Sequence, residues 1–223
     1  MPRFAAIEGL RAWLAWVVVF SHIGQSLGLA DHGGRSLWLA RAGEAAVLVF
    51  ITVSGFVIAG LVIDKQETWP RYITRRAFRI FPAFWAAYAA ALFALPLAIS
   101  ALPYLQWIGD PQFTYDELLA SWAKAMADHP WQQISLHLTL LQGVVPDSAW
   151  PFTSVAVLGP AWSLSLEWQF YLVAPVFVWL VTQDRYRMAT AIGVGVLSLA
   201  FHYGLFGSFT LPSFLPGAAF VFE

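Results

Sequence analysis

The stretch AAVLVFITVSGFVIAGLVI, residues Ala45–Ile63, decides the fold class of this chain. It has 19 residues and no charged side chain, and a helix of about 20 apolar residues spans the hydrocarbon core of a bilayer. Four further long apolar runs are Ala12–Leu29, Pro82–Leu102, Trp162–Val181 and Met188–Phe206, and a final one is Phe209–Phe222. The pattern predicts an all-α polytopic transmembrane helical bundle of about six to seven spans, forming one domain over residues 1–223.

The composition supports a chain that lies in lipid. Hydrophobic residues make up 59% of it and charged residues only 11%, whereas soluble domains average about 45–50% and about 25%. A net charge of −1 gives no reason to expect a nucleic-acid partner. The absence of cysteine excludes disulfides, thiolate zinc sites and a cysteine nucleophile. No histidines and carboxylates have metal-ligand spacing, so we expect no metal.

The distribution of lysine and arginine predicts the orientation in the membrane, because cytoplasmic loops carry an excess of both. The connection between the second and third apolar runs holds five of the 12 cations: Lys65, Arg71, Arg75, Arg76 and Arg79. The connection Pro103–Ala161 holds Lys124 alone. We therefore predict a cytoplasmic N-terminus and a multi-pass protein of the inner (cytoplasmic) membrane. The short run Ile134–Val145 is predicted to be interfacial or re-entrant, because about 20 residues are needed to cross.

Two polar residues of the first apolar helix are candidates for catalysis. His22 follows Arg11 by eleven positions, and eleven steps of about 100° end roughly 20° past three full turns, so both share a face. They are separated by about 16 Å along the helix axis. A neutral imidazole can accept a proton from a hydroxyl group. A purely structural hydrogen bond from His22 to a neighbouring helix is equally compatible with this pattern.

Three arginines form a second candidate site. Arg75, Arg76 and Arg79 are spaced so that one helical segment would gather their guanidinium groups. Pro82 is predicted to separate this short basic helix from the third span. Arginine binds phosphate oxygens in a bidentate manner, so a phosphate-bearing donor such as coenzyme A is one possible ligand. From these residues alone, an anchor for anionic lipid headgroups is the more favoured interpretation.

Glu167 is the third candidate, because an ionisable residue inside an apolar span is costly and often functional. Ser163, Glu167 and Tyr171 are four residues apart and are expected to line one helix face. The carboxylate could bind a sugar hydroxyl or orient an imidazolium. A structural pair with a buried arginine, or a neutral acid, is equally open.

Other polar positions are predicted to be structural. Ser54, Gly55 and Ala59 favour a close helix–helix contact, and no G-x-S-x-G motif supports a serine hydrolase. His137 and His202 are isolated histidines, which are more often structural than catalytic.

Taken together, the chain resembles the acyltransferase 3 family of integral membrane acyltransferases. Four motifs carry the resemblance in the order of the family: Ile7-Glu8-Gly9-Leu10-Arg11-Ala12 followed by His22, Val53-Ser54-Gly55-Phe56, Arg76-x-x-Arg79-Ile80-x-Pro82, and Trp162-Ser163-Leu164-x-x-Glu167-x-Gln169-Phe170-Tyr171. It covers essentially the whole chain, and Leu215-Pro216-Gly217-Ala218 is similar to the start of a later span.

The resemblance implies transfer of an acyl group, commonly acetyl, from cytosolic acyl-CoA to a hydroxyl or amine. The acceptor would be a carbohydrate or glycoconjugate, and the membrane lipid would be the other partner. His22, Arg11 and Glu167 fall on the catalytic positions, and Arg76 and Arg79, with neighbouring Arg75, on the donor-binding positions.

This sequence differs from the family in length, because members usually have about ten spans and the last spans are missing here. A non-catalytic truncated remnant is therefore one alternative. A membrane transporter or channel is another, in which polar residues would line a pathway, but transporters usually contain internal repeats and none is seen in the sequence.

Overall fold

A computed structural model describes residues 5–26, 35–65, 67–101, 104, 115–209 and 211–217. The elements in this part are α1 (Ala5–Ser26), α2 (Arg35–Lys65), α3 (Trp69–Ala101), α4 (Tyr115–Asp128), α5 (Pro130–Leu138), the 3₁₀ turn η3 (Gln142–Val144), α6 (Ala161–Thr182), α7 (Asp184–His202) and α8 (Phe214–Gly217). These residues contain helices and no strand, which confirms the predicted all-α fold class.

Four of these helices are long and apolar enough to cross a membrane: α1, α2, α3 and α6. They correspond to four of the predicted spans. Most of the fifth predicted run, Met188–Phe206, lies in α7, which has 19 residues and carries Asp184, Arg185 and Arg187 near its start, so that its uncharged part is shorter than a full span. In the described part of the final predicted run, Phe209–Phe222, the one helix is α8, which has four residues.

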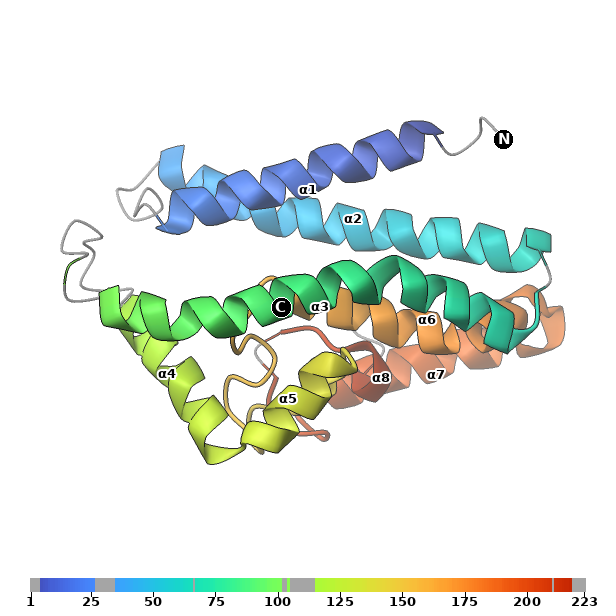
Figure 1. Cartoon of the computed structure of the whole chain (residues 1–223). Coiled ribbons are helices and arrows are strands. Elements are labelled where there is room, and N and C mark those ends of the chain that lie inside the picture. The colour runs from blue at the N-terminus through green and yellow to red at the C-terminus, as the bar shows by residue number, and fades with distance from the viewer. Residues whose placement is uncertain are drawn as a thin grey trace.

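The long helices run antiparallel to one another in sequence order (Figure 1). The α2–α3 and α6–α7 turns lie together at one end of the molecule, which we call the basic end because Lys65, Arg71, Arg75, Arg185 and Arg187 lie there. At the opposite end, α4 and α5 fold back below α3 (Figure 1). We call these two helices, residues 115–138, the cap. The short run Ile134–Val145 falls in α5 of this cap and in η3 and forms no membrane-crossing helix.

Helix α3 continues through Pro82, so the predicted break between a basic helix and the third span is wrong. A proline inside a helix removes one backbone hydrogen bond, but tertiary packing can offset this loss. Here the ring of Phe81 packs edge-on against Trp168 of α6 with centroids 4.8 Å apart. At the start of α3, the indole of Trp69 donates to the carbonyl of Leu172 at 3.1 Å. These contacts are consistent with one continuous helix that carries both Arg75, Arg76 and Arg79 and the apolar half of α3.

Small residues bring α1 against α2 in the half of these helices nearer the cap. Ser21 is 1% exposed and Ala46 is 4% exposed. A Cβ atom placed on Gly43 would clash with Oγ of Ser21 and would lie only 2.6 Å from its Cβ. The two backbones can therefore approach closely here only because position 43 has no side chain.

Helix α2 then connects α1 to the rest of the molecule through α6. The predicted close contact at Ser54 and Gly55 fits this interface, since Ser54 is 2% exposed and a Cβ on Gly55 would lie 3.9 Å from the Phe170 ring. In this way α2 positions α1, and Arg11 on it, beside α6.

Candidate active site

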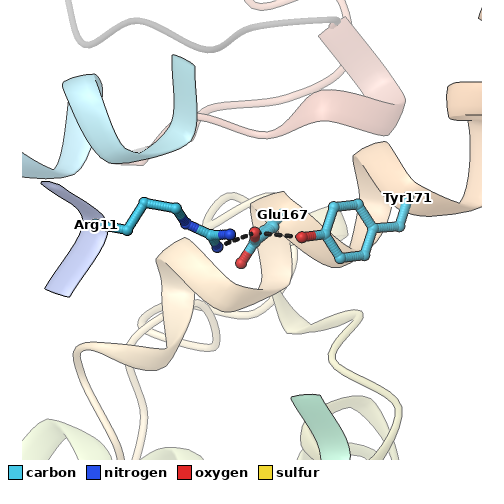
Figure 2. Close-up of polar contacts among 3 residues, drawn as sticks. All are labelled: Arg11, Glu167 and Tyr171. Carbon is cyan, nitrogen blue, oxygen red and sulfur yellow. Dashed lines mark hydrogen bonds and ion pairs between the residues drawn. The ribbon is translucent and has the colours of Figure 1, made fainter. Parts of the chain in front are cut away.

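The centre of the candidate site is an ion pair between helices that are far apart in sequence. Arg11 of α1 donates from Nη2 to Oε1 of Glu167 of α6 at 3.1 Å (Figure 2). The side chains are 13% and 5% exposed, respectively. A buried ion pair needs further polar contacts because both charges have left water.

Two neighbours supply such contacts. The hydroxyl group of Tyr171, one turn along α6, donates to the same Oε1 of Glu167 (Figure 2). On the other side, the guanidinium carbon of Arg11 lies 4.7 Å from the centroid of the Phe50 ring of α2, within the range of a cation–π contact. Three helices thus hold one guanidinium group in place.

The pair lies in the wall of a cavity of about 310 Å³. Its polar lining comes from Arg11, Arg79, Glu167 and Tyr171. The remaining walls are apolar: Phe50, Ile80, Ala83, Phe84, Ala87, Leu158 and Leu164. A cleft with apolar walls and a few convergent polar groups is the usual form of a small-molecule site.

The charges around this cavity do not cancel. Arg11 and Arg79 contribute two positive charges and Glu167 one negative charge. Among the ion pairs formed by the described residues, Glu167 binds Arg11, and Arg79 takes part in none. One positive charge, that of the exposed Arg79, therefore remains at the cavity to attract an anionic or strongly polarised ligand.

The other two predicted donor-binding arginines lie nearer the basic end. Arg76 lines a small pocket with Lys65, Glu67 and Tyr72, and its buried Nε has no hydrogen-bond partner. Arg75 is directed elsewhere, since its Nη1 donates to Glu67 at 2.7 Å. The structure therefore separates the predicted cluster: Arg76 and Arg79 line successive pockets, and Arg75 forms a partly exposed ion pair.

His22 is not brought into the same cavity. It lies near the cap end of α1, four residues before Ser26, and its side chain is exposed. It is about 16 Å farther along α1 than Arg11. His22 therefore does not line the cavity that Arg11 and Glu167 share, and only a ligand long enough to reach from one to the other could contact both.

A second polar pair on α6 was missed from the sequence. Gln169 Oε1 accepts hydrogen bonds from Ser213 Oγ at 3.0 Å and from the backbone amides of Phe214 and Leu215 at 3.0 and 2.9 Å. One turn earlier, Ser165 Oγ donates to the carbonyl of Leu140 at 2.8 Å. A serine and a glutamine four residues apart inside an apolar span are the signal that could have revealed this network.

The predicted alignment of Ser163 with Glu167 and Tyr171 holds only for the last two. The Ser163 hydroxyl group donates to the carbonyl of Pro160 at 3.1 Å, and Ser163 does not line the cavity. Its hydroxyl group is bound to the backbone at the start of α6 instead.

Comparison with known proteins gives the family of the chain. A family model described as an acyltransferase domain matches residues 4–222. The acyltransferase MdmB of Streptomyces mycarofaciens is 28% identical over 89% of this chain and 46% of its own length. BcsY of Komagataeibacter xylinus, whose name describes a membrane-bound transacylase, is 26% identical over 87% of this chain and 42% of its own length.

Nodulation protein 10 of Rhizobium leguminosarum bv. viciae is 27% identical over 85% of this chain and 48% of its own length. The chain thus spans less than half the length of each of these three relatives. No solved structure matches. Because the family model covers nearly every residue, the resemblance seen in the sequence is confirmed, and the chain belongs to this acyltransferase family.

Proposed function

We propose that the protein is a membrane acyltransferase that moves an acyl group, commonly acetyl, from acyl-CoA to a hydroxyl of a carbohydrate or glycoconjugate. The observation that carries this proposal is the cavity in which the Arg11–Glu167 pair and Arg79 leave one uncompensated positive charge between apolar walls. Acyl-CoA combines the features that such a site requires, namely phosphates, a polarised thioester and an apolar acyl group.

The donor would enter from the basic end, which we propose lies on the cytosolic side of the inner membrane. Lys65 and Arg76 line the outer pocket, and Arg79 lines the inner one. Because Arg76 and Arg79 are three residues apart on α3, they lie roughly one turn apart, about 4.5 Å along the axis. Both could bind phosphate oxygens with charge-assisted hydrogen bonds, and Arg75, paired with Glu67, would lie at the entrance.

In this proposal Arg11 binds the donor rather than the acceptor. Glu167 and Tyr171 fix its guanidinium group, so that little conformational entropy is lost when a ligand binds. The long flexible arm of the donor would then extend from Arg79 and Arg11 toward His22. The separation of about 16 Å between Arg11 and His22 along α1 is therefore a distance that the donor itself bridges.

The transfer step would use His22 as the general base. Its neutral imidazole would remove the proton from the acceptor hydroxyl, whose oxygen attacks the thioester carbonyl carbon. The carbon–sulfur bond breaks, and the departing sulfur takes the proton from the imidazolium. The products are an ester and free CoA, with histidine neutral again, so that no metal or redox cofactor is needed for the balance.

The test is transfer of radiolabelled acetyl-CoA to a glycan acceptor by the protein in proteoliposomes. We expect transfer by the wild type and loss of at least 100-fold in His22→Ala, because general base catalysis contributes about 10²–10⁴-fold. His202→Ala is the matched control, since His202 is also a histidine with an exposed side chain near the end of a long helix but lies on α7. It should retain the wild-type rate.

Full transfer by His22→Ala would remove the proposed base. No transfer by the wild type, together with no binding of acetyl-CoA, would contradict the proposed function as a whole and favour a non-catalytic remnant.

A further inference from the structure

The outer pocket contains two buried polar atoms for which the described residues supply no hydrogen-bond partner. They are the hydroxyl oxygen of Tyr72 and Nε of Arg76. Tyr72 precedes Arg76 by one turn of α3, and the guanidinium carbon of Arg76 lies 5.8 Å from the centroid of the Tyr72 ring. Buried polar groups nearly always have a partner, so two such atoms in one pocket indicate a group that binds there.

The size and charge of the outer pocket favour one oxygen atom of an anion. Its volume is about 20 Å³, and about 10–15 Å³ is enough for one water-sized group. Lys65 and Arg76 line the pocket with Glu67, and Arg75 binds the same carboxylate, so that three positive charges face one negative charge. A phosphate group held at the mouth by Lys65, whose side chain is 42% exposed, could project a single oxygen toward Tyr72.

The outer pocket adjoins the cavity beside Arg11 at the position of Glu167. Electrostatic interactions link Glu167 both to Tyr72, which lines the outer pocket, and to Tyr171, which lines the cavity. A ligand bound at Tyr72 is therefore close to the Arg11–Glu167 pair and on the path that the donor would follow inward.

We infer that Tyr72 is a further donor-binding residue, whose hydroxyl group donates, together with Nε of Arg76, to one phosphate oxygen of the donor. This inference rests on the proposed function, since it adds a residue to the site of the same donor. Because no described residue accepts a hydrogen bond from this hydroxyl group, a ligand can bind it without breaking a hydrogen bond of the fold.

The first experiment measures equilibrium binding of radiolabelled acetyl-CoA to the wild type, Tyr72→Phe and Tyr88→Phe. Tyr88 is the matched control, because it is a second buried tyrosine of α3 whose hydroxyl group has no partner among the described residues. It lies about 24 Å nearer the cap and lines neither the outer pocket nor the cavity beside Arg11. We expect Kd to rise about tenfold or more in Tyr72→Phe, as for a lost hydrogen bond to a charged group, and less than twofold in Tyr88→Phe.

The second experiment assigns the effect to the phosphates of the donor. It compares kcat/KM for acetyl-CoA with kcat/KM for S-acetylpantetheine, which has the same thioester but no phosphate. We expect the ratio of the two to fall about tenfold or more in Tyr72→Phe and to keep its wild-type value in Tyr88→Phe. The ratio is taken within each protein, so a partial loss of folded protein does not affect it.

A wild-type Kd and ratio in Tyr72→Phe would overturn the inference, because a bound water rather than the donor would then satisfy Tyr72. An equal loss in Tyr88→Phe, or a parallel loss for both donors, would overturn it as well. In each of these cases transfer by the wild type would leave the proposed function intact. If the wild type neither binds acetyl-CoA nor transfers its acetyl group, the proposed function fails and the inference fails with it.

Discussion

At the residue scale, the carboxylate of Glu167 satisfies two donors that come from different parts of the chain. Arg11 and the Tyr171 hydroxyl group both donate to Oε1. The sequence left open whether Glu167 has a functional or a structural role, and both interpretations rested on the cost of an ionisable residue inside a span. The structure shows the pairing with an arginine, and the same pair lines the cavity, so a substitution that breaks the pair also changes the cavity wall.

Substitutions at this pair should have graded effects. Glu167→Ala removes the only ion-pair partner of Arg11 among the described residues, and an unpaired buried charge costs about 3–5 kcal/mol. Tyr171→Phe removes one hydrogen bond to a charged group, worth about 1.5–3 kcal/mol, and leaves the ion pair. Thermal unfolding in detergent should therefore show a larger decrease in Tm for Glu167→Ala. Equal decreases would show that the ion pair has little importance for stability.

A second residue, His137 of the cap, should make stability depend on pH. Its side chain is 0% exposed, its Nδ1 lies 2.7 Å from the Gln133 carbonyl, and its ring stacks on Tyr88 at 5.1 Å. Burial lowers the pKa of His137 below its usual value of 6.5. The unfolded chain therefore binds a proton more readily than the folded one, so the stabilisation is complete above about pH 6.5 and is lost as the pH falls below it.

Amide hydrogen exchange of α5 should accordingly become faster when the pH is lowered from about 7.5 to about 5, after correction for the intrinsic exchange rate. His137→Gln cannot take up this proton and should lose the dependence. His129→Gln, which changes a partly exposed histidine at the start of α5, should keep it. The same acid response in His137→Gln would rule out His137 as its source.

At the element scale, the contact between α1 and α2 determines where Arg11 and His22 lie. Gly43→Ala would place a methyl group against the short side chain of Ser21, 2.6 Å from its Cβ. Neither atom lies at the end of a flexible chain, so the helices must separate, at a cost of about 1–3 kcal/mol. We expect a lower Tm and weaker donor binding, since Arg11 moves with α1.

The double variant Ser21→Gly/Gly43→Ala should recover most of this loss, because it removes the opposing Cβ. Gly60→Ala is a control in the same helix, where an added Cβ would have no atom within 4 Å. A Gly43→Ala protein with wild-type Tm would mean that the two helices are less closely packed than the structure shows.

The same scale shows how far the sequence could predict the fold and the site. The apolar runs predicted α1, α2, α3 and α6 because hydrocarbon thickness determines helix length. The continuity of α3 through Pro82 could not be predicted, since it depends on packing with Trp168 of α6. The pairing of Arg11 with Glu167 joins residues 156 positions apart, and helix periodicity relates only near neighbours. Residue type identified both as candidates, whereas only the fold identified their partnership.

At the scale of the whole molecule, the arrangement of the helices predicts that the cap and the basic end lie on opposite sides of the membrane. The absence of native cysteines allows a direct test. Lys124→Cys in the cap and Asp184→Cys at the basic end replace residues whose side chains are 74% and 92% exposed. A membrane-impermeant maleimide added to intact spheroplasts should label position 124 and should reach position 184 only after lysis. Labelling of both positions before lysis would contradict the proposed orientation.

We propose that Arg79, which forms no ion pair among the described residues and lies beside the Arg11–Glu167 pair, binds an acyl-CoA donor. This step is tested by equilibrium binding of radiolabelled acetyl-CoA to the purified protein and to Arg79→Ala, with Arg71→Ala as the control. Arg71 is an exposed arginine on the same helix that lines neither pocket. We predict that Arg79→Ala weakens binding about tenfold or more, as expected for losing charge-assisted hydrogen bonds, and that Arg71→Ala changes it less than twofold. Equal affinity in the wild type and Arg79→Ala would contradict the account.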